Sequence, residues 1–146
     1  MAKKTFRCQL VTPTARVTDD EALYVNLPLW DGLMGFIPGR GPILARLGMG
    51  EMTMEFQDKD QGGVVTRSFF VEGGTAKMEN DVLTVLADTA IPAEELTVNS
   101  AEAEWRAANA MPAGTGTTAL AQADAKTAAM DRARAKMVIA RKSDGI

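Results

Sequence analysis

The sequence contains no histidine and a single cysteine, Cys8, among its 146 residues. Histidine is the commonest general base and the commonest metal ligand in proteins, so its absence excludes the usual acyl-transfer triads and histidine-containing zinc sites. One cysteine excludes an internal disulfide. Cys8 alternates with Phe6 and Leu10 along a predicted strand, which favours a buried structural thiol. We therefore expect neither a catalytic constellation nor a bound cofactor.

Long apolar runs and targeting segments are also lacking. Although 46% of the residues are hydrophobic, no run approaches the roughly 18 apolar residues of a membrane-spanning helix. The N-terminal residues pass from two lysines into alternating sequence, without an apolar or arginine-rich leader. These features predict a soluble, globular protein that is neither secreted nor imported into an organelle.

Charge is unevenly distributed along the chain. The formal net charge is −3, but residues 126–142 carry six basic side chains and one acidic side chain, Asp131. This basic segment has a charge of +5 and leaves −8 on the remainder. An acidic body with one basic end does not indicate general nucleic-acid binding. It predicts either an acidic partner for the C-terminal end or a solvated helix face with favourable dipole interactions.

From Lys3 to about Thr97, alternation of apolar and polar residues predicts β-strands. Turns are predicted at residues 11–14 and 58–63, at Gly73-Gly74 and at Glu79-Asn80. The acidic run Asp19-Asp20-Glu21 is interpreted as a further solvated turn, because a metal site needs more ligands than this run supplies. Such closely spaced turns, with no helical stretch between strands, predict an antiparallel β-sandwich or flattened barrel in residues 1–92.

After Ala93 the apolar period becomes helical, and residues 93–146 are predicted to form a two-helix antiparallel hairpin. Ser100 is expected to cap the first helix, whose apolar stripe is Ala101, Trp105, Ala108 and Met111. Thr117 or Thr118 is expected to cap the second helix, which should run to about Arg141 with the stripe Ala119, Ala123, Met130, Ala133 and Met137. The basic side chains Lys126, Arg132, Arg134 and Lys136 are expected to lie largely outside this stripe. Because alanine buries little surface, the seam should be weak, and the hairpin can adopt more than one arrangement.

The segment Gly32–Leu44 combines four glycines and two prolines with short apolar pieces. By itself it indicates a corner between two packed layers. It matches neither phosphate-binding glycine pattern, and its prolines remove amides that a phosphate loop would use. Trp30, beside this segment in a predicted exposed turn, is a plausible anchor for a partner.

Two motifs together carry a resemblance to a known family. They are Gly-Leu-Met-Gly-Phe-Ile-Pro-Gly-Arg-Gly-Pro-Ile-Leu at Gly32–Leu44 and Leu-Thr-Val-Leu-Ala-Asp-Thr-Ala at Leu83–Ala90. In this order and spacing the chain resembles the epsilon subunit of the rotary, proton-translocating ATP synthase. The resemblance implies a non-catalytic central-stalk subunit whose β-sandwich binds the gamma subunit and the membrane ring of c subunits. It also implies a C-terminal hairpin that regulates ATP hydrolysis, transient contact with the alpha and beta subunits, and a peripheral place on the cytoplasmic side of a bacterial plasma membrane.

The same resemblance assigns partner-binding residues. Contacts with gamma and the c ring fall on Trp30, Asp31, Gly32, Leu33, Gly35, Pro38, Gly39, Arg40 and Pro42. Contacts with an acidic loop of the beta subunit fall on Arg132, Arg134 and Lys136.

The sequence departs from the family pattern at three places. Arg40-Gly41 replaces the usual histidine and small residue, and Leu33 replaces a common carboxylate, with Asp31 nearby. The segment Leu96–Ala101 lacks the acid and the arginine through which some bacterial members bind ATP, so tight ATP binding is not expected. The alternative hypothesis is a free-standing β-sandwich module, unrelated to the rotor, that binds a ligand or protein at the glycine-rich segment.

Overall fold

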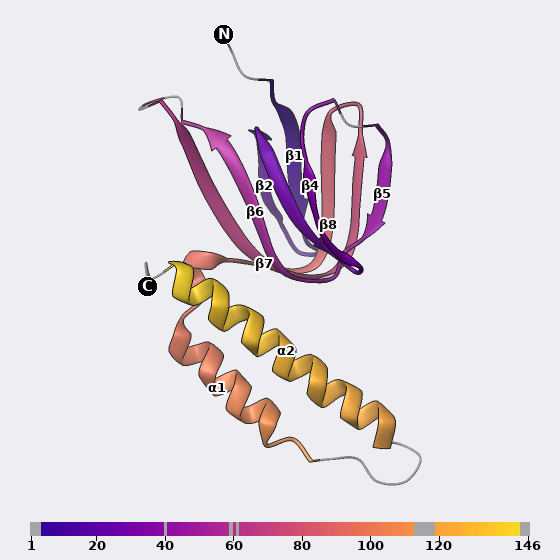
Figure 1. Cartoon of the computed structure of the whole chain (residues 1–146), viewed down its shortest axis with the longest axis vertical. Helices are drawn as coiled ribbons and strands as arrows, with labels where there is room; N and C mark the ends of the chain where they lie inside the picture. The colour runs from indigo at the N-terminus through magenta and orange to yellow at the C-terminus, as the bar shows by residue number, and fades with distance from the viewer. Residues whose placement is uncertain (1–3, 40, 59, 61, 113–118, 144–146) are drawn as a thin grey trace. The chain divides into compact units, whose positions relative to one another are not determined.

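The computed structural model describes residues 4–39, 41–58, 60, 62–112 and 119–143. The chain divides into two compact units, a β unit (Met1–Pro92) and a helical unit (Ala93–Ile146) (Figure 1). Among the described residues, no helix is both long enough and apolar enough to cross a membrane.

Eight strands form one sheet within the described part of the β unit. Their order in the sheet is β2-β1-β8-β7-β6-β3-β4, with β5 paired to β7. Neighbours are antiparallel except β1 and β8, which are parallel. The predicted sandwich is thus confirmed, with one parallel pair that the sequence did not indicate. The strands are β1 (Phe6–Val11), β2 (Arg16–Ala22), β3 (Tyr24–Leu29), β4 (Gly32–Phe36), β5 (Ile43–Arg46), β6 (Met49–Gln57), β7 (Val64–Glu79) and β8 (Val82–Pro92).

Burial alternates along the strands, because successive side chains of a strand point to opposite faces of the sheet. On β1, Phe6, Cys8 and Leu10 are buried. Buried side chains of β2, β3, β4, β6, β7 and β8 join them in one apolar cluster. The Cys8 thiol donates to Met54 Sδ at 3.6 Å, and burial raises the pKa of Cys8 to about 12. The predicted buried thiol is confirmed, and it stays protonated at neutral pH.

The pair Gly73-Gly74 does not form the predicted turn, because both residues lie inside the continuous strand β7. Both have positive φ, +71° and +112°, and they lie where β7 passes from its pairing with β6, which ends at Glu72, to its pairing with β5, which begins at Thr75. Figure 1 shows that β7 curves strongly along its length. Gly73 N donates to Gly48 O at 3.1 Å, and Leu47 N donates to Gly74 O at 3.0 Å. Positive φ serves a bend within a strand as well as a turn between strands, which explains the error.

The turn that does follow β7 is Asn80-Asp81, one residue later than predicted. Both residues have positive φ, +54° and +58°, and Glu79 pairs with Val82 across them. Two residues of this conformation match the right-handed twist of the flanking strands, and asparagine and aspartate tolerate it better than other side chains. The predicted hairpin loop at residues 58–63 is confirmed by the bond from Asp58 N to Gly63 O at 3.0 Å.

In the helical unit, a 3-10 turn (Ala93–Glu95) precedes α1 (Val98–Asn109) and α2 (Ala119–Ser143). The cap of α1 is Thr97 and not Ser100: the Thr97 side chain accepts a bond from Ser100 N at 3.1 Å. Threonine is also a good N-cap residue, so the helix begins three residues before the predicted position. The predicted caps Thr117 and Thr118 lie outside the described residues.

The seam between α1 and α2 is built mainly from alanine. Ala101 and Ala108 of α1 are buried, as predicted, and Trp105 is half-buried between them. On α2, Ala133 is buried and Met130 and Met137 are half-buried, but Ala123 is exposed, contrary to the prediction. The buried residues extend instead toward the C-terminal end of α2, at Ile139 and Ala140.

The bend of β7 leads to a first prediction. A β-carbon at Gly74 would overlap the carbonyl oxygen of Leu86, and a residue with a side chain is strained at this φ. Gly74→Ala should therefore lower the free energy of unfolding by about 2 kcal/mol or more, measured by urea denaturation with circular dichroism. Gly41→Ala is the control, because its β-carbon would meet nothing within 4 Å. Equal unfolding midpoints for the two variants would contradict this account of the bend.

Candidate functional site

The β3–β4 hairpin presents the most exposed apolar side chains of the predicted binding segment. Leu29 pairs with Gly32, so Trp30 and Asp31 form a two-residue turn. Trp30 and Leu33 are each 70% exposed. The backbone beneath them is fixed, since Trp30 N donates to Arg46 O at 3.0 Å. The predicted exposed turn at Trp30 is confirmed, and we call Trp30, Asp31, Gly32 and Leu33 the hairpin tip.

Gly35 has a packing role on β4. The strand turns Phe36 into the core, which places Gly35 on the opposite face of the sheet. There a β-carbon at Gly35 would collide with the Tyr24 ring. The glycine leaves room for this ring to lie over the strand, so Gly35 shapes the surface and offers no side chain to a partner.

The predicted residues Pro38, Gly39 and Pro42 lie in a different place from the hairpin tip. They follow the far end of β4, a strand of 5 residues, and the first and last Cα atoms of such a strand lie about 13 Å apart. Gly39 has φ of +86°, and its amide donates to Asp81 Oδ1 at 2.8 Å. Arg40 lies outside the described residues. The eight of these nine residues that the structure describes therefore do not form one patch: the hairpin tip lies at one end of β4, Gly35 lies within the strand, and Pro38, Gly39 and Pro42 follow its other end.

Asp81 is a functional candidate that the sequence reasoning missed. Its carboxylate holds the Gly39 amide and its backbone oxygen accepts from Arg7 N at 2.9 Å. Through these two hydrogen bonds, the turn between β7 and β8 holds both β1 and the segment that links β4 to β5. No local signal could have revealed this link, because Gly39 and Asp81 are 42 positions apart.

The Gly39–Asp81 bond gives a second prediction. Asp81→Gly keeps the positive φ but removes the acceptor, whereas Asp81→Asn keeps both. Hydrogen exchange of the Gly39 amide should become roughly five- to tenfold faster in Asp81→Gly, since its one exposed hydrogen-bond acceptor is lost. The rate in Asp81→Asn should stay near that of the parent chain. If exchange is the same in all three proteins, this bond does not hold the connection.

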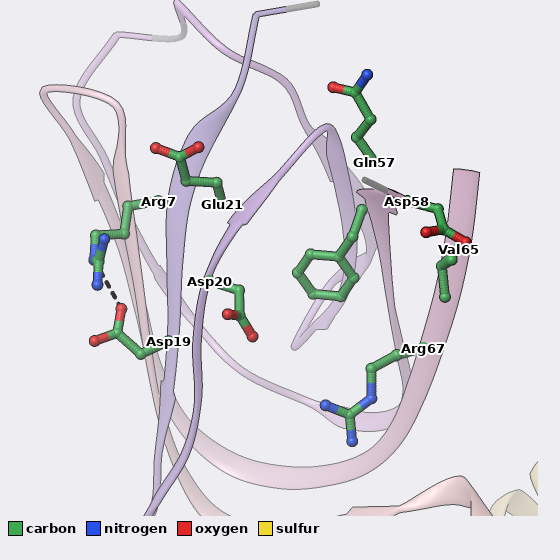
Figure 2. A pocket seen from close by; sticks show the side chains of 9 residues that line it. Arg7, Asp19, Asp20, Glu21, Gln57, Asp58, Val65 and Arg67 are labelled. Atoms are coloured by element: carbon green, nitrogen blue, oxygen red, sulfur yellow. Dashed lines mark ion pairs between the residues drawn. The ribbon is translucent and has the colours of Figure 1, made fainter. Parts of the chain in front are cut away.

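An open hollow of about 590 Å³ lies between β1–β2 and β6–β7. Figure 2 shows its charged lining, with Arg7 and Asp19 on one side and Arg67 on the other. Arg7 Nε lies 2.7 Å from Asp19 Oδ1, and the hydrogen bond from this guanidinium holds the pKa of Asp19 below its ordinary value.

The run Asp19-Asp20-Glu21 does not form the predicted turn. It belongs to strand β2, because its residues pair with Arg7, Cys8 and Gln9 of β1. Among the described residues, no group of three or more cysteine and carboxylate side chains is placed to hold a metal ion.

The basic residues predicted to bind the beta subunit do not share one face of α2. Arg132 and Lys136 are four positions apart and so share one face of α2, whereas Arg134, two positions from each, points in a different direction. Arg134 is exposed and pairs with Asp131 at 3.5 Å. The Lys136 side chain is only 13% exposed, and its Nζ lies 3.1 Å from both carboxylate oxygens of Glu104 on α1. The prediction that Lys136 lies outside the seam is therefore wrong.

A second hollow of about 450 Å³ opens between the two helices. Trp105 and Met137 provide its apolar lining, and Arg106 and Arg134 its charged rim. Arg106 also pairs with Glu102 within α1, at 3.6 Å. Thr97, at the start of α1, is used as the helix cap.

The architecture defines the class of the protein: a β-sandwich with an exposed apolar hairpin tip, followed by a separate hairpin of two helices. The profile of the family described as ATP synthase, Delta/Epsilon chain, beta-sandwich domain matches residues 5–93. The ATP synthase epsilon chain of Rhodopirellula baltica is 36% identical over 133 residues, covering 91% of this chain and 96% of the relative. That of Pelotomaculum thermopropionicum is 33% identical over 108 residues, covering 74% and 76%. The chain belongs to the ATP synthase epsilon chain family.

Solved structures share the fold at low identity. A chain in a cryo-EM structure of the Euglena gracilis mitochondrial ATP synthase, comprising OSCP, F1 and c-ring, has a TM-score of 0.73 and 16% identity. The match covers 90% of this chain and 80% of that one. A chain in the central stalk and c-ring of the Tetrahymena thermophila mitochondrial ATP synthase has a TM-score of 0.65 and 12% identity, covering 94% and 99%. The family membership removes the alternative of an unrelated, free-standing binding module.

Proposed function

We propose that the chain is the central-stalk epsilon subunit of an ATP synthase, peripheral to the cytoplasmic side of a bacterial plasma membrane. In this proposal the β unit couples the gamma subunit to the c ring. The helical unit restrains ATP hydrolysis through transient contacts with the alpha and beta subunits. The subunit performs no catalysis itself and does not bind ATP tightly.

The exposure of Trp30 and Leu33 carries the docking part of the proposal. Two large apolar side chains, each 70% exposed at one hairpin tip, lose water-contacting surface when a partner covers them. Their backbone is held by the bond from Trp30 N to Arg46 O and by the bridge between Leu29 and Leu47. A rigid tip is ordered before it binds, so less conformational entropy is lost on docking.

A third prediction follows for the hairpin tip. The double variant Trp30→Ala, Leu33→Ala should weaken binding to a purified gamma–c-ring subcomplex by about 30-fold or more, because truncation of central apolar anchors typically costs at least 2 kcal/mol. Surface plasmon resonance measures the dissociation constant. Leu120→Ala is the matched control, since Leu120 is 74% exposed but lies on α2. A double variant that binds as tightly as this control would rule out the hairpin tip as the docking surface.

The composition of the α1–α2 seam supports a regulatory role for the helical unit. Its fully covered positions include Ala101, Ala108, Ala133 and Ala140, and alanine removes little apolar area from water. At about 25 cal/mol per Å², such a seam contributes only a few kcal/mol before ordering costs. An element held this weakly can exchange between arrangements.

The fourth prediction tests the division of roles. A chain ending at Leu96 keeps β8 and the 3-10 turn but lacks the Thr97 cap and both helices. The truncated subunit should assemble with gamma and the c ring, and the complex should hydrolyse ATP several-fold faster, as measured by a coupled ATPase assay. Failure to assemble, or hydrolysis at the parent rate, would refute the assignment of docking to the β unit and regulation to the helices.

A further inference from the structure

The connection between β4 and β5, residues 37–42, includes the predicted contact residues Pro38, Gly39 and Pro42. Side-chain packing does not enclose its backbone, because a β-carbon at Gly39 or at Gly41 would meet nothing within 4 Å. Gly39 has φ of +86°, and a glycine takes negative φ about as readily as positive φ. The path of the connection therefore depends on contacts from elsewhere in the chain.

The Asp81 carboxylate supplies such a contact. Its Oδ1 accepts a hydrogen bond from Gly39 N at 2.8 Å, near the middle of the connection. Asp81 is itself held, because its backbone oxygen accepts from Arg7 N at 2.9 Å. Its φ of +58° belongs to a tight turn that the pairing of Glu79 with Val82 closes. The acceptor is thus attached to the sheet, whereas the donor belongs to the openly placed connection.

Exposed apolar side chains lie at both ends of the connection. Ile37, directly after β4, is 47% exposed, and Leu44, the second residue of β5, is 74% exposed. Such side chains lose water-contacting surface when a partner covers them. A connection without a fixed path must also be ordered at that moment, and this ordering costs conformational entropy.

We propose that Asp81 is a positioning residue for the docking of the β unit. By holding the Gly39 amide, Asp81 orders the connection before the partner covers it, so less conformational entropy is lost on binding. Asp81 acts through Gly39 and does not itself contact the partner. The inference rests on the proposed function and adds a residue on which the predicted contact segment depends.

The size of the effect follows from the exposure of the bond. Gly39 N and Asp81 Oδ1 form an exposed hydrogen bond, so water competes for both groups and the net contribution of the bond is small. The loss of Asp81 should therefore weaken docking by a few-fold, less than the loss of Trp30 and Leu33 together.

The first experiment measures binding of Asp81 variants to the purified gamma–c-ring subcomplex by surface plasmon resonance. Asp81→Gly keeps the positive φ but removes the acceptor, and it should raise the dissociation constant roughly three- to tenfold. Asp81→Asn keeps an oxygen that can accept from Gly39 N and should bind like the parent chain. If Asp81→Gly binds like the parent, or if Asp81→Asn loses as much as Asp81→Gly, the inference is wrong.

Asn80→Gly is the matched control for the backbone of the turn. Asn80 precedes Asp81, is exposed and has φ of +54°. A glycine there also loosens the turn, but it leaves the Asp81 carboxylate in place. The dissociation constant should stay near the parent value. Equal losses in Asn80→Gly and Asp81→Gly would assign the effect to the turn and not to the carboxylate.

A double-mutant cycle distinguishes positioning from a general loss of structure. Ile37→Ala should weaken binding roughly threefold in the parent chain, and by less in Asp81→Gly, where the connection is no longer ordered. Trp30→Ala, at the other end of β4, should have the same effect in both backgrounds. Additive effects at Ile37, or equal coupling of Ile37 and Trp30 to Asp81, would overturn the inference.

The hairpin-tip variant separates the two possible failures. If Trp30→Ala, Leu33→Ala weakens binding but Asp81→Gly does not, the proposed docking function stands and the positioning role of Asp81 falls. If the parent chain itself does not bind the gamma–c-ring subcomplex, the proposed function is wrong.

Discussion

The close approach of three backbone segments at the bend of β7 is the constraint on which the β unit depends. Leu47 N donates to Gly74 O, Gly73 N donates to Gly48 O, and Gly48 N donates to Pro28 O. A β-carbon at Gly48 would lie 2.7 Å from Leu29 O, so this close approach requires glycine at position 48. The bend lets one sheet close over its own core. It also anchors the chain immediately beside the hairpin tip, so the fold and the exposure of Trp30 share one cause.

The sequence predicted the parts of this fold that depend on local pattern. Period-two burial identified the strands, and the change to helical period after Ala93 identified the hairpin. It failed where one residue type serves two conformations: Gly73-Gly74 fits a turn as well as a bend, and the pairing of β7 with β5, β6 and β8 on either side of the glycines decides between them. The parallel pairing of β1 with β8 is a similar case, because strand order is a property of the whole sheet.

The candidate sites show the same division between local and distant information. The exposure of Trp30 followed from its place between two short apolar runs. The spacing of Arg132, Arg134 and Lys136 already places Arg134 on a different helix face from the other two. The partner of Lys136 was not predictable, because it depends on the register of α2 against α1 across residues 113–118.

The two units are stabilised by different physical means, and this difference fits the roles that we propose for them. The β unit buries phenylalanine, leucine and methionine side chains in one cluster and adds long-range backbone bonds, so opening any strand exposes much apolar surface. The helical unit relies on alanine contacts and on the Glu104–Lys136 ion pair between its helices. A docking surface must keep its shape while force passes through it, whereas a switch needs two states of similar free energy. In the proposed function, the β unit meets the first requirement and the weakly packed helical unit meets the second.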